Sequence, residues 1–78
     1  MTNTTVPLRS TEEVARSIGN NIKSVLSEQS HDLEWLAAEI GIDVQTILTQ
    51  FSSTVEGWLT LDAAFYLNVP ADRLLEGI

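Results

Sequence analysis

Apolar residues recur at helical spacing along most of the chain, in stretches separated by short polar breaks. The first stretch follows Ser10, and its apolar positions fall on one face of a helix of roughly four turns: Val14, Ile18, Ile22, Val25 and Leu26. Ser10 and Glu13 match a capping box, in which each side chain accepts a hydrogen bond from the other residue's backbone amide. Residues 1–9 have no periodicity, so they are predicted to form a tail before one helical domain of residues 10–78.

The middle of this first helix has low helix propensity. Its segment 19–21 reads Gly-Asn-Asn, and Gly inside a helix costs about 1 kcal/mol relative to Ala. The first helix is therefore expected to depend on its packing against the rest of the domain.

Two shorter helices are predicted on either side of Gly41. Asp32 is a good N-cap for the earlier one, whose expected inner face consists of Leu33, Leu36, Ala37 and Ile40. Gly41 should end that helix in the left-handed conformation, with Ile42 folding back onto it. Asp43 then caps the next helix, in which apolar residues occur at i, i+3, i+4 and i+7: Val44, Ile47, Leu48 and Phe51.

The last third of the chain predicts a loop and two more helices. The segment 52–58 is expected to be the loop, and Thr60 is expected to cap a fourth helix that buries Leu61, Ala64, Phe65 and Leu67. Asn68 is suited to end this helix in the left-handed conformation. Pro70 fits the first turn of a short last helix that carries Leu74 and Leu75. Five helices with very short links predict an all-α fold.

Composition excludes several classes of protein. The chain has no cysteine, so it forms no disulfide and offers no thiolate. Its one histidine, His31, has no set of partners for a zinc site or a nucleophile–base pair. We therefore expect no enzyme activity, no cofactor and no metal. No apolar run is long enough to cross a membrane, and the start of the chain lacks the apolar core of a signal peptide, so a cytoplasmic location is expected.

Charge is the most unusual feature of the composition. The formal net charge is −7, and no lysine or arginine lies between Lys23 and Arg73. The same stretch holds Glu28, Asp32, Glu34, Glu39, Asp43, Glu56, Asp62 and Asp72. Such a surface repels phosphate polymers and attracts basic partners. The simpler interpretation is that the acidic residues keep a small protein soluble.

Three segments together resemble the Cro/CI-type (lambda-repressor-like, XRE) family of helix-turn-helix regulators. Segment 36–43, Leu-Ala-Ala-Glu-Ile-Gly-Ile-Asp, is similar to the family's Leu-Ala-x-x-Leu-Gly-Val-Ser signature. Segment 18–23 resembles the family's first helix, and segment 67–75 resembles its closing Leu-Gly-Val-Ser/Pro…Leu-Leu. The resemblance covers about residues 14–77 and implies a compact five-helix domain that binds operator DNA as a homodimer.

The resemblance also implies which residues would contact DNA. In such a domain the third helix enters the major groove, which makes Val44, Gln45 and Thr49 the base-facing candidates. Gln45 could pair with adenine. The alternative is that Gln45 and Thr49 are simply exposed to solvent. Lys23 stands where the family often places a basic residue that contacts a DNA phosphate.

This chain departs from the family in ways that weaken the DNA hypothesis. The expected recognition helix, 43–51, has no basic residue, and Gln50 stands where the family usually buries an apolar side chain. Specific DNA-binding proteins often neutralise about 6–10 phosphates, whereas this chain has only four lysine and arginine residues. Two of these four, Arg9 and Arg73, fall outside the expected DNA face. The alternative hypothesis is an acidic protein-binding module, such as an antirepressor or a DNA mimic, that keeps the fold and binds a basic protein.

The protein-binding alternative has its own candidate residues. Val44 and Leu48 would form an exposed apolar strip if the third helix is rotated relative to the family. Trp is common at binding hot spots, although both tryptophans could equally complete a thin core. An apolar chain end is expected if it packs on a second subunit. The interface candidates are Trp35, Val44, Leu48, Trp58 and Ile78.

Overall fold

A computed structural model of the chain describes residues 10–78, which form five α-helices and no strand. The helices are α1 (Thr11–Glu28), α2 (Leu33–Ile40), α3 (Val44–Phe51), α4 (Gly57–Leu67) and α5 (Ala71–Leu74). This confirms the predicted all-α fold for residues 10–78. The expected tail, residues 1–9, lies outside the described residues. No helix among residues 10–78 is long and apolar enough to span a membrane.

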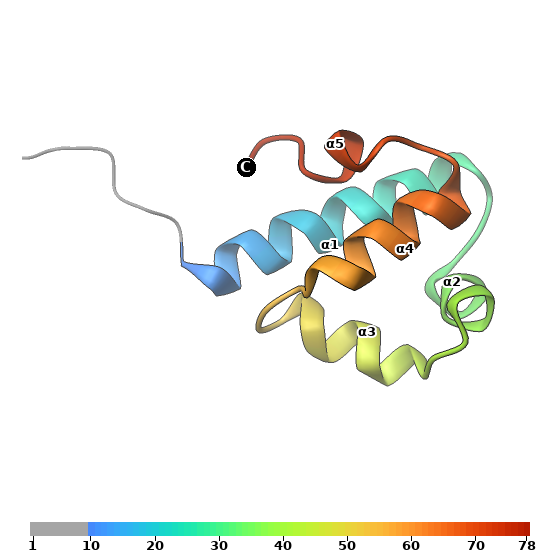
Figure 1. The fold of residues 1–78 in the computed structure, drawn as a ribbon, viewed down its shortest axis with the longest axis horizontal. Coiled ribbons are helices and arrows are strands. Elements are labelled where there is room, and N and C mark those ends of the chain that lie inside the picture. Colours follow the sequence, from blue (N-terminus) through green and yellow to red (C-terminus); the bar gives the residue numbers. More distant parts are fainter. Residues whose placement is uncertain (1–9) are drawn as a thin grey trace, which may run out of the picture.

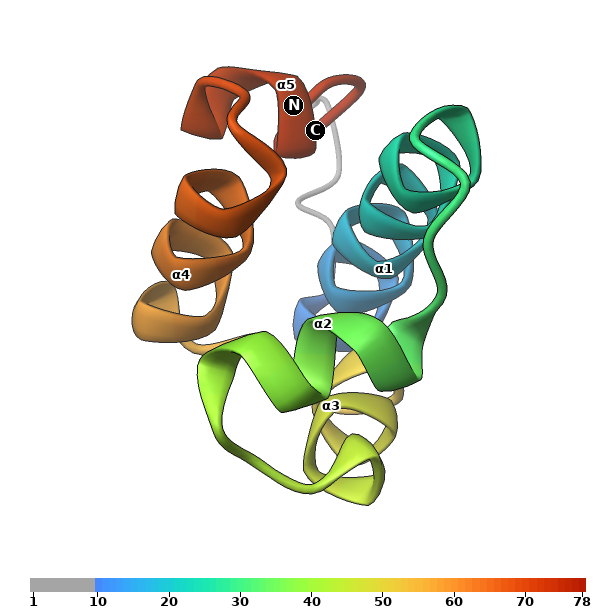
Figure 2. The same ribbon diagram turned by 90° about the vertical axis from the view of Figure 1, so that its right-hand side faces the viewer.

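The five helices surround one core. The long α1 and α4 run beside each other, with α5 packed on both of them (Figure 1). At the other side of the core, α2 bridges towards α4 and α3 packs against both α1 and α2 (Figure 2). Each helix contributes at least one fully buried apolar side chain to this core, as in Ile22, Leu36, Ile47, Leu59 and Leu74.

The predicted start and inner face of α1 are confirmed. Ser10 Oγ accepts a hydrogen bond from Glu13 N and Glu13 Oε1 accepts one from Ser10 N, each at 3.1 Å. The predicted apolar positions face the core, with only Val14 partly exposed. The helix therefore begins where local hydrogen bonding predicts it.

The low-propensity segment in the middle of α1 has a packing role that the sequence did not reveal. A Cβ atom on Gly19 would lie 2.8 Å from Cγ of Phe51, so the absence of a side chain lets α3 approach α1. Asn21 Nδ2 donates to the backbone carbonyls of Leu74 and Glu76, both at 2.9 Å. These contacts hold α3 and the C-terminal segment against α1.

The turn between α2 and α3 has the predicted geometry. Asp32 caps α2 by accepting from Trp35 N at 2.8 Å, and Gly41 ends it with φ +90°. The amides of Gly41 and Ile42 both donate to the carbonyl of Ala37, at 2.8 and 3.0 Å, so Ile42 folds back onto α2. Asp43 accepts from Gln45 N at 3.2 Å and thereby caps α3.

Replacing Gly41 by alanine is expected to lower the free energy of unfolding by about 1 kcal/mol. The cause is the left-handed backbone alone, because a Cβ atom on Gly41 would have no neighbour within 4 Å. Gly57 is a matched control, since its Cβ would also lie in open space but its φ is not positive. Gly57→Ala should raise stability by about 0.4–1 kcal/mol by restricting the unfolded chain. Urea denaturation of both variants checks this, and equal effects would contradict it.

The predicted start of α4 is wrong, and its predicted inner face is right only for Ala64 and Leu67, which are buried. The helix begins at Gly57, not after Thr60, and Thr60 is buried inside it. Leu61 and Phe65, expected in the core, are 63% and 75% exposed, whereas other positions are buried in their place: Leu59, Thr60 and Ala63. Both sides of this helix are apolar, so the periodicity alone could not select the buried side. The predicted end is confirmed, since Asn68 is left-handed with φ 59°.

The last helix is shorter than predicted. Pro70 precedes α5 with an extended backbone (ψ 149°) instead of lying in its first turn. Leu74 is fully buried, but Leu75 follows the helix and is exposed. A single helical turn presents only one of these neighbouring leucines to the core.

Candidate nucleic-acid interface

The outward surface of α3 is polar at its centre. Gln45, Thr46 and Thr49 are exposed, and they line one shallow hollow together with the flanking Asp43 and Gln50. The fold thus brings together Gln45 and Thr49, two of the residues that the sequence analysis named as DNA contacts. They are four residues apart on one helix, so their side chains project from the same face.

The two apolar candidates on α3 have different surroundings. Val44 is partly buried and packs against the core, whereas Leu48 is 39% exposed. The two side chains therefore do not form one exposed apolar strip. Gln50 is half-buried, and its Oε1 accepts from Glu56 N at 2.9 Å, which fixes the loop between α3 and α4.

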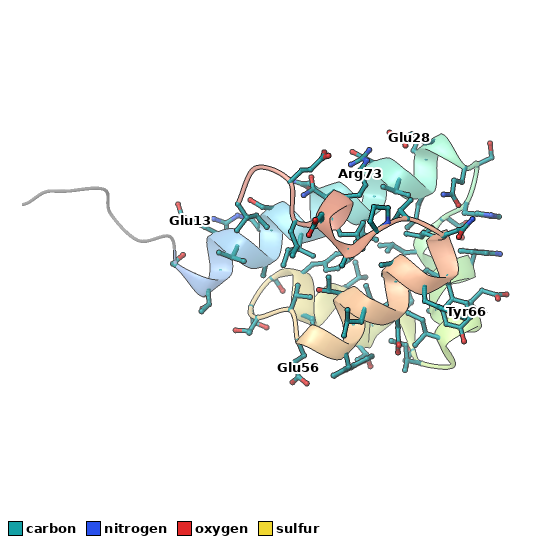
Figure 3. All side chains as sticks on the ribbon, turned by 45° about the horizontal axis from the view of Figure 1, so that its top comes forward. Glu13, Glu28, Glu56, Tyr66 and Arg73 are labelled. Carbon is teal, nitrogen blue, oxygen red and sulfur yellow. The ribbon has the colours of Figure 1, made fainter. Side chains whose placement is uncertain are left out.

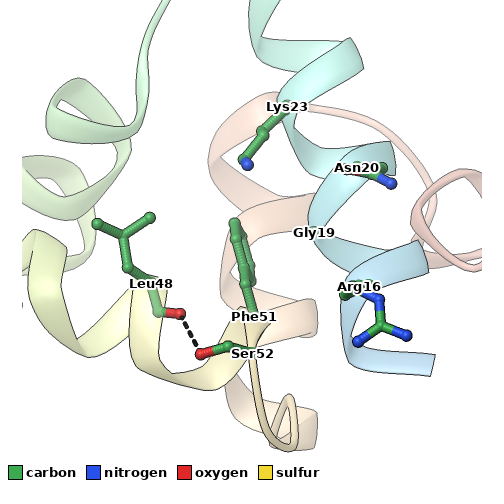
Figure 4. Close-up of a pocket in the computed structure, with 7 residues that line it drawn as sticks. All are labelled: Arg16, Gly19, Asn20, Lys23, Leu48, Phe51 and Ser52. Atoms are coloured by element: carbon green, nitrogen blue, oxygen red, sulfur yellow. Dashed lines mark hydrogen bonds between the residues drawn. The ribbon is translucent and has the colours of Figure 1, made fainter. Parts of the chain in front are cut away.

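A second hollow, next to the α3 surface, is formed where α1 passes α3 (Figure 4). Arg16, Asn20 and Lys23 lie along α1 at i, i+4 and i+7, so they share one side of the helix. From α3 the hollow receives Leu48, Phe51 and Ser52. Lys23 Nζ lies 5.9 Å from the centroid of the Phe51 ring, within the range of a cation–π contact. Together with Gly19, these residues line what we call the α1–α3 hollow.

The basic side chains of residues 10–78 fall into two groups. Arg73 forms ion pairs with Glu28 at 2.9 Å and with Glu76 at 3.4 Å, and Figure 3 shows it next to Glu28. Within the described part of the chain, no ion pair joins Arg16 or Lys23 to a carboxylate. Arg16 and Lys23, the two basic residues without an acidic partner among residues 10–78, therefore both line the α1–α3 hollow.

Acidic and basic residues therefore lie at different edges of this surface, although the chain as a whole is acidic. Helix α3 itself carries no charged residue from Val44 to Phe51. Asp43 caps its start and lies beside Gln45, so one end of the α3 surface is anionic. Leu48 and Ser52 lie near Arg16 and Lys23, which makes the opposite edge cationic.

The remaining interface candidates lie on different elements. Trp35 on α2 is partly buried, and its ring stacks on His31 with 3.7 Å between centroids. Trp58 on α4 is 40% exposed, and its Nε1 donates to Glu56 Oε1 at 2.7 Å. Ile78 is exposed at the chain end. Neither tryptophan is fully buried, although Trp35 does pack against the core.

Sequence reasoning missed two features of the surface. Arg16 and Asn20 were not among the candidates, although their spacing to Lys23 could have shown that all three share a helix face. The outward apolar side of α4 was missed because Leu61 and Phe65 were assigned to the core. No protein-family model, curated protein or solved structure matches the chain.

Proposed function

We propose that this chain is a small prokaryotic or phage transcription regulator that binds operator DNA as a homodimer, with α3 in the major groove. The observation that carries the proposal is the surface where α3 presents Gln45 and Thr49 beside the cationic edge of the α1–α3 hollow. The sequence resemblance to Cro/CI-type regulators supports the same function.

The dimensions and chemistry of this surface suit DNA. The eight residues of α3 span about 12 Å, and the major groove is wide enough for a helix. Gln45 can form a bidentate pair with adenine, and Thr49 can contact a base edge or a phosphate. Arg16 and Lys23 would contact the phosphate backbone, which positions the helix without reading sequence.

The number of available cations sets the expected strength of binding. One copy has two basic residues, Arg16 and Lys23, that lack an acidic partner among residues 10–78, so a dimer has four. Many specific DNA-binding proteins neutralise roughly 6–10 phosphates, which is more than four basic residues can do. Hydroxyl and backbone amide groups can supply further phosphate contacts. The net charge of −7 opposes the approach of DNA at long range. Binding is therefore expected to be weak and to require low salt.

Selection from a random DNA pool at about 50 mM salt, followed by fluorescence anisotropy on the enriched sequence, tests the proposal. Gln45→Ala should relax the preference for one base pair, at a cost of about 1–3 kcal/mol, and Thr49→Ala should weaken binding. Thr54→Ala, an exposed threonine beyond α3, should leave the preference unchanged. The absence of any enriched sequence, together with no complex at micromolar protein, would refute DNA binding.

A second candidate function is an acidic protein-binding module, such as an antirepressor or a DNA mimic. The observation that favours it is the outward side of α4, where Leu61 and Phe65 are largely exposed. In this alternative the helical fold is kept but α3 contacts no DNA. If the selection enriches no DNA sequence and the chain binds a basic protein tightly, the protein-binding function is favoured over DNA binding.

A further inference from the structure

Helix α4 is apolar on two opposite sides, and this chain covers only one of them. Its inner side, which includes Leu59, Ala63 and Leu67, is buried in the core. Trp58, Leu61 and Phe65 lie at i, i+3 and i+7 on the opposite side and are 40%, 63% and 75% exposed. A surface helix normally carries charged and polar residues on its outer face, whereas this outer face has three large apolar side chains and one charge, Asp62. The outer side therefore has the composition of a surface that a partner covers.

The aromatic side chains of this surface have contacts within the chain. The indole Nε1 of Trp58 donates to Glu56 Oε1 at 2.7 Å. Phe65 packs edge-to-face against Tyr66, with 5.1 Å between ring centroids and an interplanar angle of 87°. Exposed aromatic side chains such as Trp58 are common at binding hot spots.

A hollow beside Leu61 extends the exposed side of α4. Its lining is almost entirely apolar and comes from α1, the loop before α4, α4 itself and the C-terminal segment: Ile18, Val55, Gly57, Thr60, Leu61, Ala71 and Leu75. A hollow next to a row of exposed apolar side chains can receive one side chain of a bound helix. We call Trp58, Leu61, Phe65 and this hollow the α4 surface.

The charges along the α4 surface indicate what kind of partner fits. Glu56 precedes α4 and Asp62 is the only charged residue within it; Figure 3 shows Glu56 and Tyr66 towards opposite ends of this helix. A second copy of the chain would bring the same two carboxylates. Within residues 10–78, Arg73 is engaged by Glu28 and Glu76, and the other bases line the α1–α3 hollow. Charge complementarity therefore favours a partner with its own lysines or arginines over a second copy.

We propose that the α4 surface binds an amphipathic helix of another protein, one whose apolar stripe is flanked by lysine or arginine. The apolar side chains of that helix cover Trp58, Leu61 and Phe65, and one of them enters the hollow beside Leu75. Its basic residues meet Glu56 and Asp62. This surface is formed by α4 and the hollow beside it, not by α3, so the proposal does not depend on whether the chain binds DNA.

The test uses two synthetic peptides of about 18 residues with the same leucine stripe at i, i+3, i+4 and i+7. One peptide has lysines beside the stripe and the other has glutamates. Each is titrated into the full chain by isothermal titration calorimetry, and backbone amide NMR shifts locate the contact. We expect saturable binding of the lysine peptide, binding of the glutamate peptide at least about tenfold weaker, and the largest shifts in α4.

Variants separate the α4 surface from general attraction to an acidic protein. The double substitution Leu61→Ala/Phe65→Ala should weaken binding of the lysine peptide by about tenfold or more, and Asp62→Asn should weaken it less. Leu48→Ala, which changes an exposed leucine on α3 without changing the net charge, is the matched control and should leave binding unchanged. Circular dichroism confirms that each variant is folded, as expected for exposed positions.

Three results would overturn the proposal. The first is no saturable binding of the lysine peptide. The second is equal binding to the parent chain and to Leu61→Ala/Phe65→Ala. The third is sedimentation showing a homodimer of the parent chain that this double substitution dissociates, because a second copy would then cover the surface. Loss of DNA binding in an α3 variant would leave this proposal intact, since the two readouts are separate.

Discussion

Replacing Gly19 by valine is expected to destabilise the domain by about 2–3 kcal/mol, although valine is the better helix former. Helix propensity alone predicts a small gain from any replacement of glycine in α1. The Cβ atom, however, would lie 2.8 Å from Cγ and 2.9 Å from Cδ2 of Phe51. The close contacts are with Cβ, Cγ and Cδ2 of Phe51, next to the backbone of α3, so relieving them requires α3 or the whole Phe51 side chain to shift. Overpacking of this kind costs about 1–3 kcal/mol, and occasionally more.

Thermal unfolding followed by circular dichroism measures this effect. In a domain of this size about 1 kcal/mol corresponds to roughly 4–8 °C in Tm. Ser24→Val, on an exposed position of the same helix, is the matched control and should change Tm little. Phe51→Ala should cost less in the Gly19→Val background than in the parent chain, because alanine removes the Cγ and Cδ2 atoms that the valine would meet. A Gly19→Val variant as stable as the parent would show that Phe51 does not hold α3 against α1.

Neutralising Arg16 and Lys23 together is expected to weaken DNA binding by at least about tenfold at low salt and to flatten its salt dependence. Each phosphate contact contributes about 0.9 to the slope of log K against log salt. The double substitution Arg16→Gln/Lys23→Gln should therefore lower the slope by about 1.8 for each bound copy. Both side chains line the α1–α3 hollow and lack an ion-pair partner among residues 10–78, so their loss should affect stability little.

Arg73→Gln is the control for this experiment, since it removes one positive charge elsewhere, and its effect is compared with the fall in slope per charge removed by the double substitution. Arg73 is held by Glu28 and Glu76, so it is not available to phosphate and its loss should leave the salt slope unchanged. The exposed ion pairs that it forms contribute at most about 1 kcal/mol to stability. Anisotropy titrations of the three proteins between about 50 and 200 mM salt give the slopes. An equal fall in slope per charge removed for Arg73→Gln would show that net charge, and not the α1–α3 hollow, governs binding.

The features that could be predicted from the sequence are those set by local hydrogen bonds. Ser10, Asp32 and Asp43 each cap a helix by accepting from an amide two or three residues later. Gly41 and Asn68 end helices in the left-handed conformation, which glycine adopts because it lacks a Cβ atom and which asparagine tolerates better than most residues. The spacing of apolar residues then predicted the inner side of α1, where only one side is apolar. Gln45 and Thr49 were named because the resemblance to Cro/CI-type regulators implies contacts at their positions, and both are exposed on α3.

Only the tertiary structure decided the features that depend on contacts between distant segments. Both sides of α4 are apolar, so the choice of which to bury was made by packing against the other helices, and Leu61 and Phe65 remained outside. Gly19 lowers the helix propensity of α1 locally, but its lack of a side chain allows α1 to contact Phe51, which lies 32 residues further along the chain. The same approach of α3 to α1 places Arg16 and Lys23 beside Leu48. Local propensity contains no information about such contacts, because they exist only once the chain has folded.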